Sequence, residues 1–463
     1  MRELAGAAAG GLRWPPALGA AAPCRHCAPT GKNVLSVLGM ANGRQREQRR
    51  ELAGRQTPVT VGAMSFVAEF NALPLADLEQ LAKTASPRDA RLALGKDQPA
   101  LTDFAALISP AAGGLLEPFC QRSQALTQQR FGKVIRLFAP LYLSNECINN
   151  CAYCGFSRDN PILRVTLAVE EVRREARALR EQGFRNLLLV AGEHPKFVAG
   201  DYLAACTRAL HAEWPSLSLE VGPMETEEYR PIVAAGAEGL VVYQETYDRA
   251  VYEQMHTAGP KRNFDWRLET PERAYAAGFR RLGIGALYGL ADWRREALSV
   301  AAHALYLLRH CWKAQVTISL PRLRPCAGEF QPLTSMSDRE LVQLVAAFRL
   351  LLPDVGLVLS TREPARLRDG LFPLGITLAS AGSHTEPGGY TGAGRDNIHR
   401  TERGRIVELA AGASEWAAAA GRSTNATGQF EIADERSPEE IADLIRRLGY
   451  EPVWKDWDAA LSA

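Results

Sequence analysis

The chain has 463 residues, of which 46% are hydrophobic and 23% are charged, and its formal net charge at pH 7 is +2. These values are ordinary for a globular protein, and a chain of this length can form one large domain or two to three smaller ones. So small a net charge gives no electrostatic reason to expect a nucleic acid or a membrane surface as a partner, and no run of about 18 apolar residues predicts a membrane-spanning helix.

The nine cysteines are scattered along the chain except for two clusters. A secreted protein held together by disulfides would be shorter and denser in cysteine, so this distribution favours a reducing compartment. We therefore expect a cytoplasmic protein whose clustered cysteines bind a metal or act in catalysis.

Residues 1–63 differ in composition from the rest of the chain, being rich in Ala, Gly, Pro and Arg, poor in acidic residues and without sustained periodicity. We interpret them as a disordered segment or as the product of a start codon assigned too far upstream, with a targeting segment as the third interpretation. Cys24 and Cys27 form a CxxC pair here, but one pair supplies too few ligands for a closed metal site. We interpret these two residues as unstructured thiols.

Residues 64–130 have the periodicity of helices, since Leu75, Leu78 and Leu81 recur at helical spacing and residues 101–108 continue the pattern. No residue in this region is expected to take part in chemistry.

Short apolar runs then alternate with longer amphipathic segments. The runs, each of a length typical of a buried strand, are 134–143, 187–190, 217–221, 240–243, 281–285, 316–320, 356–360 and 376–380. Helical periodicity lies between most of them, at 169–179, 202–214, 227–235, 271–277, 294–310 and 338–352, while the connections around the fourth and seventh runs are less clear. This alternation predicts an α/β fold in which residues 131–385 form a parallel (β/α)8 barrel of the TIM type and residues 386–463 form a C-terminal extension that closes it.

In such barrels the reacting groups lie on the loops that follow the carboxyl ends of the strands. Cys147, Cys151 and Cys154 follow the first predicted strand in the spacing CxxxCxxC. Three thiolates this close can bind three corners of a cubane iron–sulfur cluster and leave the fourth iron without a protein ligand, as a catalytic centre requires. The spacing resembles that of the radical S-adenosylmethionine (SAM) superfamily, in which the open iron binds the amino and carboxylate groups of SAM.

Other interpretations of the cysteines are three buried thiols without a metal and a zinc site completed by a distant histidine. A non-enzymatic iron–sulfur carrier and a zinc-stabilised binding protein are the corresponding alternatives for function. Electron carriers normally use four clustered cysteines, which weighs against the carrier.

Polar residues follow the other predicted strands. Gly192 and Glu193 follow the second strand and resemble the superfamily's glycine–glutamate motif, whose backbone receives the ammonium group of the cofactor. His194 beside them is interpreted as a solvated loop histidine. The third and fourth strands are followed by residues suited to the ribose hydroxyls and the substrate, namely Glu220, Tyr243 and Glu245.

Arg267 and Glu269 offer a cation and a carboxylate where the carboxylate of the cofactor could pair, since an arginine binds carboxylates with two parallel hydrogen bonds. Gly285, on the fifth strand, belongs to a glycine run that misses the GxGxxG spacing, so we expect close approach of the backbone to adenine and no dinucleotide-binding fold. Arg362 and Ser380 follow adjacent strands, and this arginine and hydroxyl are suited to the carboxylate of a free amino acid.

With these motifs assembled, the chain from about Leu75 to Leu461 resembles the 2-iminoacetate synthases, the tyrosine lyases of thiamine thiazole biosynthesis. The segments that carry the resemblance are 140–144, 147–157, 190–194, 242–247, 266–270, 321–326, 359–363, 387–390 and 453–458. They include most of the barrel loops and the C-terminal tail, and are therefore more specific than the cysteines alone.

The resemblance implies a [4Fe-4S] cluster on the three cysteines and SAM as cofactors. The residues implied for cofactor binding are Tyr153, Gly192, Glu193, Glu220, Arg267, Glu269, Gly285 and Leu287. Those implied for catalysis on L-tyrosine are Arg362, Ser380, Glu245 and Tyr243. It also implies a flavodoxin- or ferredoxin-type electron donor and thiazole synthase as a protein partner.

The implied reaction begins when a 5′-deoxyadenosyl radical from SAM removes a hydrogen atom from the amino group of tyrosine. The Cα–Cβ bond then breaks, giving p-cresol and 2-iminoacetate (dehydroglycine), with 5′-deoxyadenosine and methionine. Because the imine hydrolyses in water, a closed barrel has the further task of excluding water.

Two features depart from the family pattern, namely the N-terminal extension and an Ala- and Gly-rich segment at 391–424. A related hydrogenase-maturation tyrosine lyase carries a further C-terminal cluster, but this chain has no cysteine after Cys326. A tryptophan lyase is the remaining alternative among the enzymes, and the ending that contains Trp454 and Trp457 argues against it.

Overall fold

The computed structural model of the protein describes residues 65–402, 405–407 and 425–454. The expectations for residues 1–63 with Cys24 and Cys27, for most of the Ala- and Gly-rich segment and for the last nine residues lie outside these ranges. Within the described ranges, no helix combines the length and the apolar content that crossing a membrane requires.

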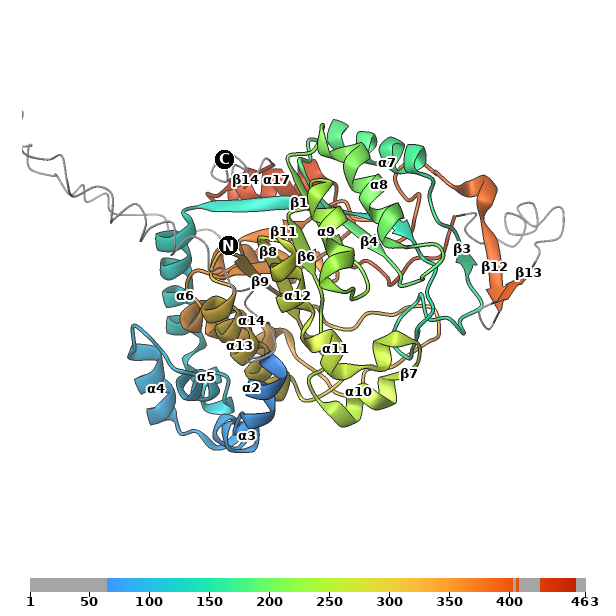
Figure 1. Cartoon of the computed structure of the whole chain (residues 1–463). Helices are drawn as coiled ribbons and strands as arrows, with labels where there is room; N and C mark the ends of the chain where they lie inside the picture. The colour runs from blue at the N-terminus through green and yellow to red at the C-terminus, as the bar shows by residue number, and fades with distance from the viewer. Residues whose placement is uncertain (1–64, 403–404, 408–424, 455–463) are drawn as a thin grey trace, which may run out of the picture. The chain divides into compact units, whose positions relative to one another are not determined.

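The helical pattern of the N-terminal region is present in the structure. Its elements are α2 (Phe66–Ala72), α3 (Leu75–Thr84), α4 (Pro87–Gly95), α5 (Leu101–Leu107), η1 (Pro110–Leu115) and α6 (Leu116–Phe131). They pack on two outer helices of the barrel, α13 (Trp293–His310) and α14 (Asp338–Leu351), as Figure 1 shows. The Phe66 ring stacks on His303 of α13 at 4.1 Å between centroids, and Phe104 contacts Phe348 of α14 at 5.1 Å. The region is therefore joined to the barrel by apolar contacts.

The predicted barrel is confirmed. Its strands, all parallel, are β1 (Val134–Ser144), β4 (Asn186–Ala191), β5 (Ser216–Glu220), β6 (Gly239–Val241), β8 (Arg281–Gly285), β9 (Gln315–Ser319), β10 (Gly356–Leu359) and β11 (Leu378–Ser380). Each strand pairs with the next in this order, and β11 returns to β1 in the register Arg136↔Leu378 and Phe138↔Ser380. This last pairing closes the barrel, so the carboxyl ends of all the strands meet on one face.

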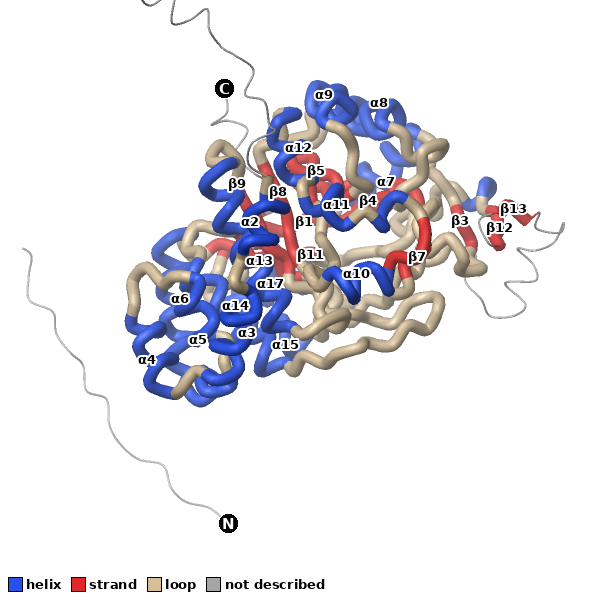
Figure 2. Tube along the Cα trace, turned by 60° about the horizontal axis from the view of Figure 1, so that its bottom comes forward, coloured by secondary structure: helices blue, strands red, loops and turns tan. Residues whose placement is uncertain are grey.

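The connecting helices lie outside the strands (Figure 2). Those that the sequence predicted are α7 (Val169–Glu181), α8 (Gly200–His211), α9 (Thr226–Ala234), α12 (Thr270–Ala277), α13 and α14. The two unclear connections contain several short elements, namely α10 (Arg249–Met255), β7 (His256–Ala258), η2 (Pro260–Arg262) and α11 (Phe264–Leu268) after β6, and α15 (Ala365–Leu371) with η3 (Phe372–Leu374) after β10. Elements of three to seven residues are too short to give a periodic signal.

The residues that carry the cysteines, 145–157, are called here the cluster loop. A short strand within it, β2 (Asn150–Cys151), pairs antiparallel with β7. The loop after the first barrel strand is thereby joined to the loop after the fourth, across the carboxyl-end face.

A small sheet adjoins the cluster loop. It consists of β3 (Leu163–Arg164), β12 (His399–Glu402) and β13 (Arg405–Val407), which lie side by side in Figure 1. His399 Nε2 is 2.5 Å from Glu146 Oε1, and the hydrogen bond to this carboxylate raises the pKa of His399 above its usual value. The sheet therefore contacts the loop immediately before its first cysteine.

The C-terminal part of the chain contacts both ends of the barrel. At the amino end, α17 (Pro438–Arg447) leads into β14 (Glu451–Val453), which pairs with the start of β1. At the carboxyl end, residues 425–434, called here the strap, cross the mouth of the barrel. The strap is held by backbone hydrogen bonds from Gln429 to Thr385 at 3.0 Å and from Ala433 to Thr361 at 3.0 Å.

Candidate active site

Two adjoining cavities open at the carboxyl ends of the strands. The cluster cavity has a volume of about 590 Å³ and is lined by residues of the cluster loop. The inner cavity has a volume of about 700 Å³ and is lined by residues at the ends of β9, β10 and β11. Both volumes include the opening to solvent. The residues that line both are Val190, Glu220, Tyr243 and Gln429. A ligand bound in one cavity would therefore lie beside a ligand bound in the other.

Cys147, Cys151 and Cys154 all line the cluster cavity, and none of them forms a disulfide. Burial raises the pKa of Cys154 to about 11 and that of Cys151 further. The free thiols of Cys151 and Cys154 would thus stay protonated near neutral pH, and their deprotonation requires a strong compensating cation such as iron. Three unpaired thiols facing one cavity fit the donor set that a cubane cluster with one open iron needs.

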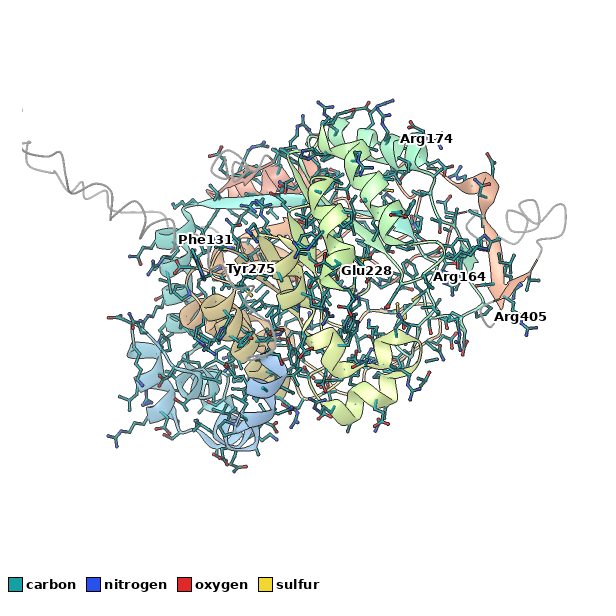
Figure 3. All side chains as sticks on the ribbon, in the orientation of Figure 1. Phe131, Arg164, Arg174, Glu228, Tyr275 and Arg405 are labelled. Carbon is teal, nitrogen blue, oxygen red and sulfur yellow. The ribbon has the colours of Figure 1, made fainter. Side chains whose placement is uncertain are left out.

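One side chain of β3, Arg164, which is labelled in Figure 3, holds both ends of the cluster loop. It is buried, with 1% of its surface exposed. Its guanidinium donates to the carbonyl oxygen of Asn145 at 2.5 Å, before the cysteines. It also donates to the carbonyl oxygens of Phe156 at 3.1 Å and Ser157 at 2.7 Å, after the cysteines. The two ends of the loop are therefore bound to the same planar group, which fixes how far the three thiols can spread.

The glycine–glutamate motif packs directly on the cluster loop. A Cβ atom at Gly192 would lie 2.2 Å from the carbonyl oxygen of Glu146, so only glycine fits there. The Glu193 carboxylate accepts a hydrogen bond from Asn149 Nδ2 at 2.7 Å, and the Glu193 carbonyl accepts one from the backbone of Ile148 at 2.7 Å. Gly192 and Glu193 thus line the cluster cavity, as the sequence predicts for residues near SAM, although their role in binding it stays a prediction.

Three charged side chains of the fourth connection form the polar wall of the cluster cavity. Lys261 Nζ is 2.7 Å from Glu245 Oε1, and Arg267 Nη2 is 3.4 Å from the same oxygen. Burial alone would raise the pKa of Glu245, but Lys261 and Arg267 outweigh it and hold that pKa below its usual value. Two cations face this one carboxylate, and their remaining N–H donors suit the carboxylate of a ligand.

The backbone of Glu245 is strained, with φ at +71° in the left-handed region that non-glycine residues seldom adopt. The strain is maintained by a hydrogen bond from the backbone of Leu287 to the Glu245 carbonyl at 2.7 Å, and by one from Gln244 to Gly285 at 3.1 Å. Such strain persists only where the surroundings require one orientation, and here it directs the carboxylate toward Lys261.

Tyr153 and Leu287, two residues implied for cofactor binding, form contacts that position the cluster loop. The Tyr153 hydroxyl is 2.7 Å from His256 Nε2, and burial together with Lys261 lowers the pKa of His256 to about 3, so this histidine is neutral. Leu287 packs with Cys151 and Tyr153 in a small apolar cluster. These contacts account for the two residues structurally.

Glu269 lines neither cavity and its carboxylate is 4.0 Å from Arg273, so its role beside the cofactor carboxylate stays a prediction. The helix α11 ends at Leu268, so Arg267 lies within this helix and Glu269 does not. For Gly285, a Cβ atom would lie 2.6 Å from the carbonyl oxygen of Ser319 on the next strand. The close packing of β8 against β9 is therefore a sufficient reason for a glycine at this position.

The inner cavity is lined by Arg362, Ser380 and Tyr243, which the sequence predicted to lie near a substrate. The Arg362 guanidinium carbon lies 3.3 Å from the centroid of the Phe430 ring in the strap, a cation–π contact. Within the described ranges this guanidinium forms no salt bridge, so its donors are available for a carboxylate. The Ser380 hydroxyl accepts from the Thr361 backbone at 3.1 Å and retains its own proton for a ligand.

Tyr142, Lys261, Gln429 and Phe430 also line these cavities but were not singled out by sequence reasoning. Lys261 follows a turn in which Gly259 has φ at +88°. The glycine–proline pair at 259–260 was the only feature of the local sequence that indicated this turn. Gln429 and Phe430 reach the site through the strap, whose contacts join residues far apart in the chain. His194, by contrast, lines neither cavity, in keeping with its interpretation as a loop histidine.

Two segments of the chain match known protein families. Residues 141–299 match the model of the radical SAM superfamily, and residues 319–451 match the biotin and thiamin synthesis associated domain. The chain is 44% identical over 380 residues to 2-iminoacetate synthase of Escherichia coli K12 and 43% identical to that of Salmonella typhimurium LT2. Each alignment covers 82% of this chain and 92% of the relative.

Solved structures give a consistent result. HydG, a maturase of the [FeFe]-hydrogenase, superposes with a TM-score of 0.73 at 30% identity, covering 84% of this chain and 81% of the other. HydG from Carboxydothermus hydrogenoformans superposes with a TM-score of 0.67 at 33% identity, covering 85% and 82%. Methylornithine synthase (PylB) shares the fold, with a TM-score of 0.57 at 18% identity over 79% of this chain and 97% of the other.

Glu220, at the junction of the two cavities, gives a prediction for the pH dependence of stability. Burial raises its pKa to about 7, although Arg362 opposes the shift. An unfolded glutamate has a pKa of about 4.3, so the folded protein binds more protons between these values and loses stability as pH rises from about 4 to about 7. Glu220→Gln should therefore stabilise the cluster-free protein at pH 8 by roughly 3–4 kcal/mol and change little at pH 4.5.

Urea unfolding at the two pH values measures this difference. Glu253→Gln, which changes an exposed carboxylate, is the matched control and should show no such dependence. Equal effects of Glu220→Gln at pH 4.5 and pH 8 would contradict the assignment.

Proposed function

Because the chain belongs to the 2-iminoacetate synthase family of radical SAM enzymes, we propose that it is a carbon–carbon lyase that cleaves L-tyrosine between Cα and Cβ. The products would be 2-iminoacetate and p-cresol, the former for the thiazole moiety of thiamine. The observation that carries the proposal is the adjacency of the two cavities, one with three free thiols and one with an arginine whose donors are available.

A [4Fe-4S] cluster and SAM would supply, when bound, the electron and the 5′-deoxyadenosyl radical that removes a hydrogen atom from the substrate. The residues proposed to hold the cluster are Cys147, Cys151 and Cys154, whose loop is fixed at both ends by Arg164. Their number leaves one iron without a protein ligand.

The N–H donors of Lys261 and Arg267 support binding of the SAM carboxylate in the cluster cavity. Glu245, held ionised between them, orients both cations and limits the charge that is buried. Gly192 allows the motif to approach the cluster loop closely, so its backbone can receive the SAM ammonium group.

In the inner cavity, Arg362 and Ser380 are proposed to bind the carboxylate of tyrosine. The guanidinium supplies a two-bond fork and the hydroxyl one further donor. Tyr243, whose hydroxyl donates to Ser319 Oγ at 2.9 Å, lines both cavities and would lie between cofactor and substrate. Phe430 stacks on Arg362, which orients the fork and excludes water from it.

The product chemistry and the cofactor support three further expectations. An imine that hydrolyses in water should pass directly to the next enzyme, for which thiazole synthase is the proposed partner. A flavodoxin or ferredoxin is the proposed source of electrons. The distribution of cysteines supports a cytoplasmic location.

Product analysis tests the proposal directly. Anaerobically reconstituted, reduced protein is incubated with SAM and either tyrosine or tryptophan, and p-cresol, 2-iminoacetate and 5′-deoxyadenosine are measured. Tyrosine should yield p-cresol. Cys151→Ala should form no 5′-deoxyadenosine, because a cubane that lacks one anchor is lost or misplaced, whereas Cys311→Ala, a buried thiol at the end of α13, is the matched control and should stay active.

If the protein cleaves tryptophan and not tyrosine, the proposed substrate is wrong and the protein is a tryptophan lyase. A protein that carries its cluster and forms no 5′-deoxyadenosine with either amino acid would refute the enzymatic function.

Arg362 can be tested by substitution. Losing a charge-assisted hydrogen bond costs about 1.5–3 kcal/mol, so Arg362→Ala should raise KM for tyrosine roughly 10- to 100-fold with a smaller change in kcat. Arg362→Lys should retain part of the affinity, since lysine supplies the charge without the fork. Arg366→Ala, which removes an exposed arginine of α15, is the control, and an unchanged KM for Arg362→Ala would remove this residue from the substrate site.

A further inference from the structure

Gln429 of the strap lies where the two cavities meet and lines both of them. Its side-chain oxygen accepts a hydrogen bond from the Tyr142 hydroxyl at 2.8 Å. Its side-chain nitrogen lies 3.9 Å from Cys154 Sγ, within the range of an N–H···S hydrogen bond. One amide therefore joins the wall of the inner cavity to a cysteine of the cluster loop.

The orientation of this amide is determined by Tyr142. In the structure the Tyr142 hydroxyl donates to the amide oxygen, and burial keeps the pKa of Tyr142 well above its usual value, so the proton of this bond is retained. With the oxygen engaged, the NH₂ group is directed toward Cys154. Tyr142 is itself held edge-on against Phe156 of the cluster loop, with ring centroids 5.9 Å apart.

The strap is positioned here without help from the Gln429 side chain. The Gly155 backbone donates to the Gln429 carbonyl at 3.2 Å, and the Gln429 backbone donates to Thr385 at 3.0 Å. A Cβ atom at Gly155 would lie 2.5 Å from the same Gln429 carbonyl, which shows how closely strap and loop approach. Replacing the side chain alone should therefore leave the backbone contacts intact.

We propose that Gln429 is a positioning residue that donates an N–H···S hydrogen bond to the Cys154 thiolate and thereby raises the reduction potential of the cluster. A donor to a cluster thiolate stabilises the more negative, reduced state and so makes the electron easier to accept. The inference rests on the cluster of the proposed function and adds a residue outside the cluster loop that sets its redox properties.

The same strap also contacts the proposed substrate site. Phe430, the next residue, stacks on Arg362, and Tyr142 and Arg362 line the same inner cavity. The donor to Cys154 is therefore carried by a segment that forms part of the substrate pocket, which places control of cluster reduction next to the bound amino acid.

The test is an EPR-monitored redox titration of the cluster-loaded full chain, without SAM or substrate. Gln429→Met removes the N–H donors at similar length, and Gln429→Glu keeps the acceptor for Tyr142 but removes the donors and adds a negative charge. Both variants should have a more negative midpoint potential than the wild type, with the larger shift for Gln429→Glu. Gln315→Met, in an exposed position at the amino end of β9, is the matched control and should titrate as the wild type.

Tyr142→Phe should shift the potential in the same direction but by less, because the amide loses its orientation and keeps its donors. The signal comes only from loaded clusters, so a variant with reduced iron content still reports a potential. A wild-type potential in Gln429→Met would overturn the inference and leave the lyase proposal intact. Failure of the wild-type protein to load any cluster would instead refute the proposed function.

Discussion

Three cysteine side chains of one short loop must face a single cavity, and the rest of the site is arranged around that requirement. Arg164 binds the backbone on both sides of the cysteines, and the pairing of β2 with β7 joins their loop to the fourth connection. The close approaches at Gly192 and Gly155 leave no room for a side chain, so the loop is confined by the glycine–glutamate motif and by the strap. A loop confined by so many contacts is preorganised, which is what metal ligands require.

The protonation of the glutamates in this site is also determined by close contacts. A buried carboxylate at Glu245 is stable only because Lys261 and Arg267 face it, and the remaining donors of these two cations suit an anionic ligand group. Glu220 forms no salt bridge within the described residues, and burial outweighs its more distant cations and raises its pKa instead. Two glutamates within one site thus differ in protonation because their neighbours differ.

The barrel could be predicted from the sequence because most strand residues are buried and the strands therefore appear as apolar runs between helical segments. The cysteines, Gly192, Arg362 and Ser380 could be found because strand ends in such a fold meet on one face. Gln429 could not be found in this way, since its contact with Tyr142 joins positions 287 residues apart. That Arg267 lines the cluster cavity and Glu269 does not could not be predicted either, because the short helix α11, which ends at Leu268 between them, gives no periodic signal.

The central claim is that three thiolates hold one cubane whose fourth iron is free to bind SAM. Mössbauer spectroscopy of the ⁵⁷Fe-loaded protein, before and after addition of SAM, tests it most directly. The account predicts a [4Fe-4S] spectrum in which one iron changes its isomer shift when SAM binds and the other three do not. A spectrum that SAM leaves unchanged would mean that all four irons are already capped, and would contradict the account.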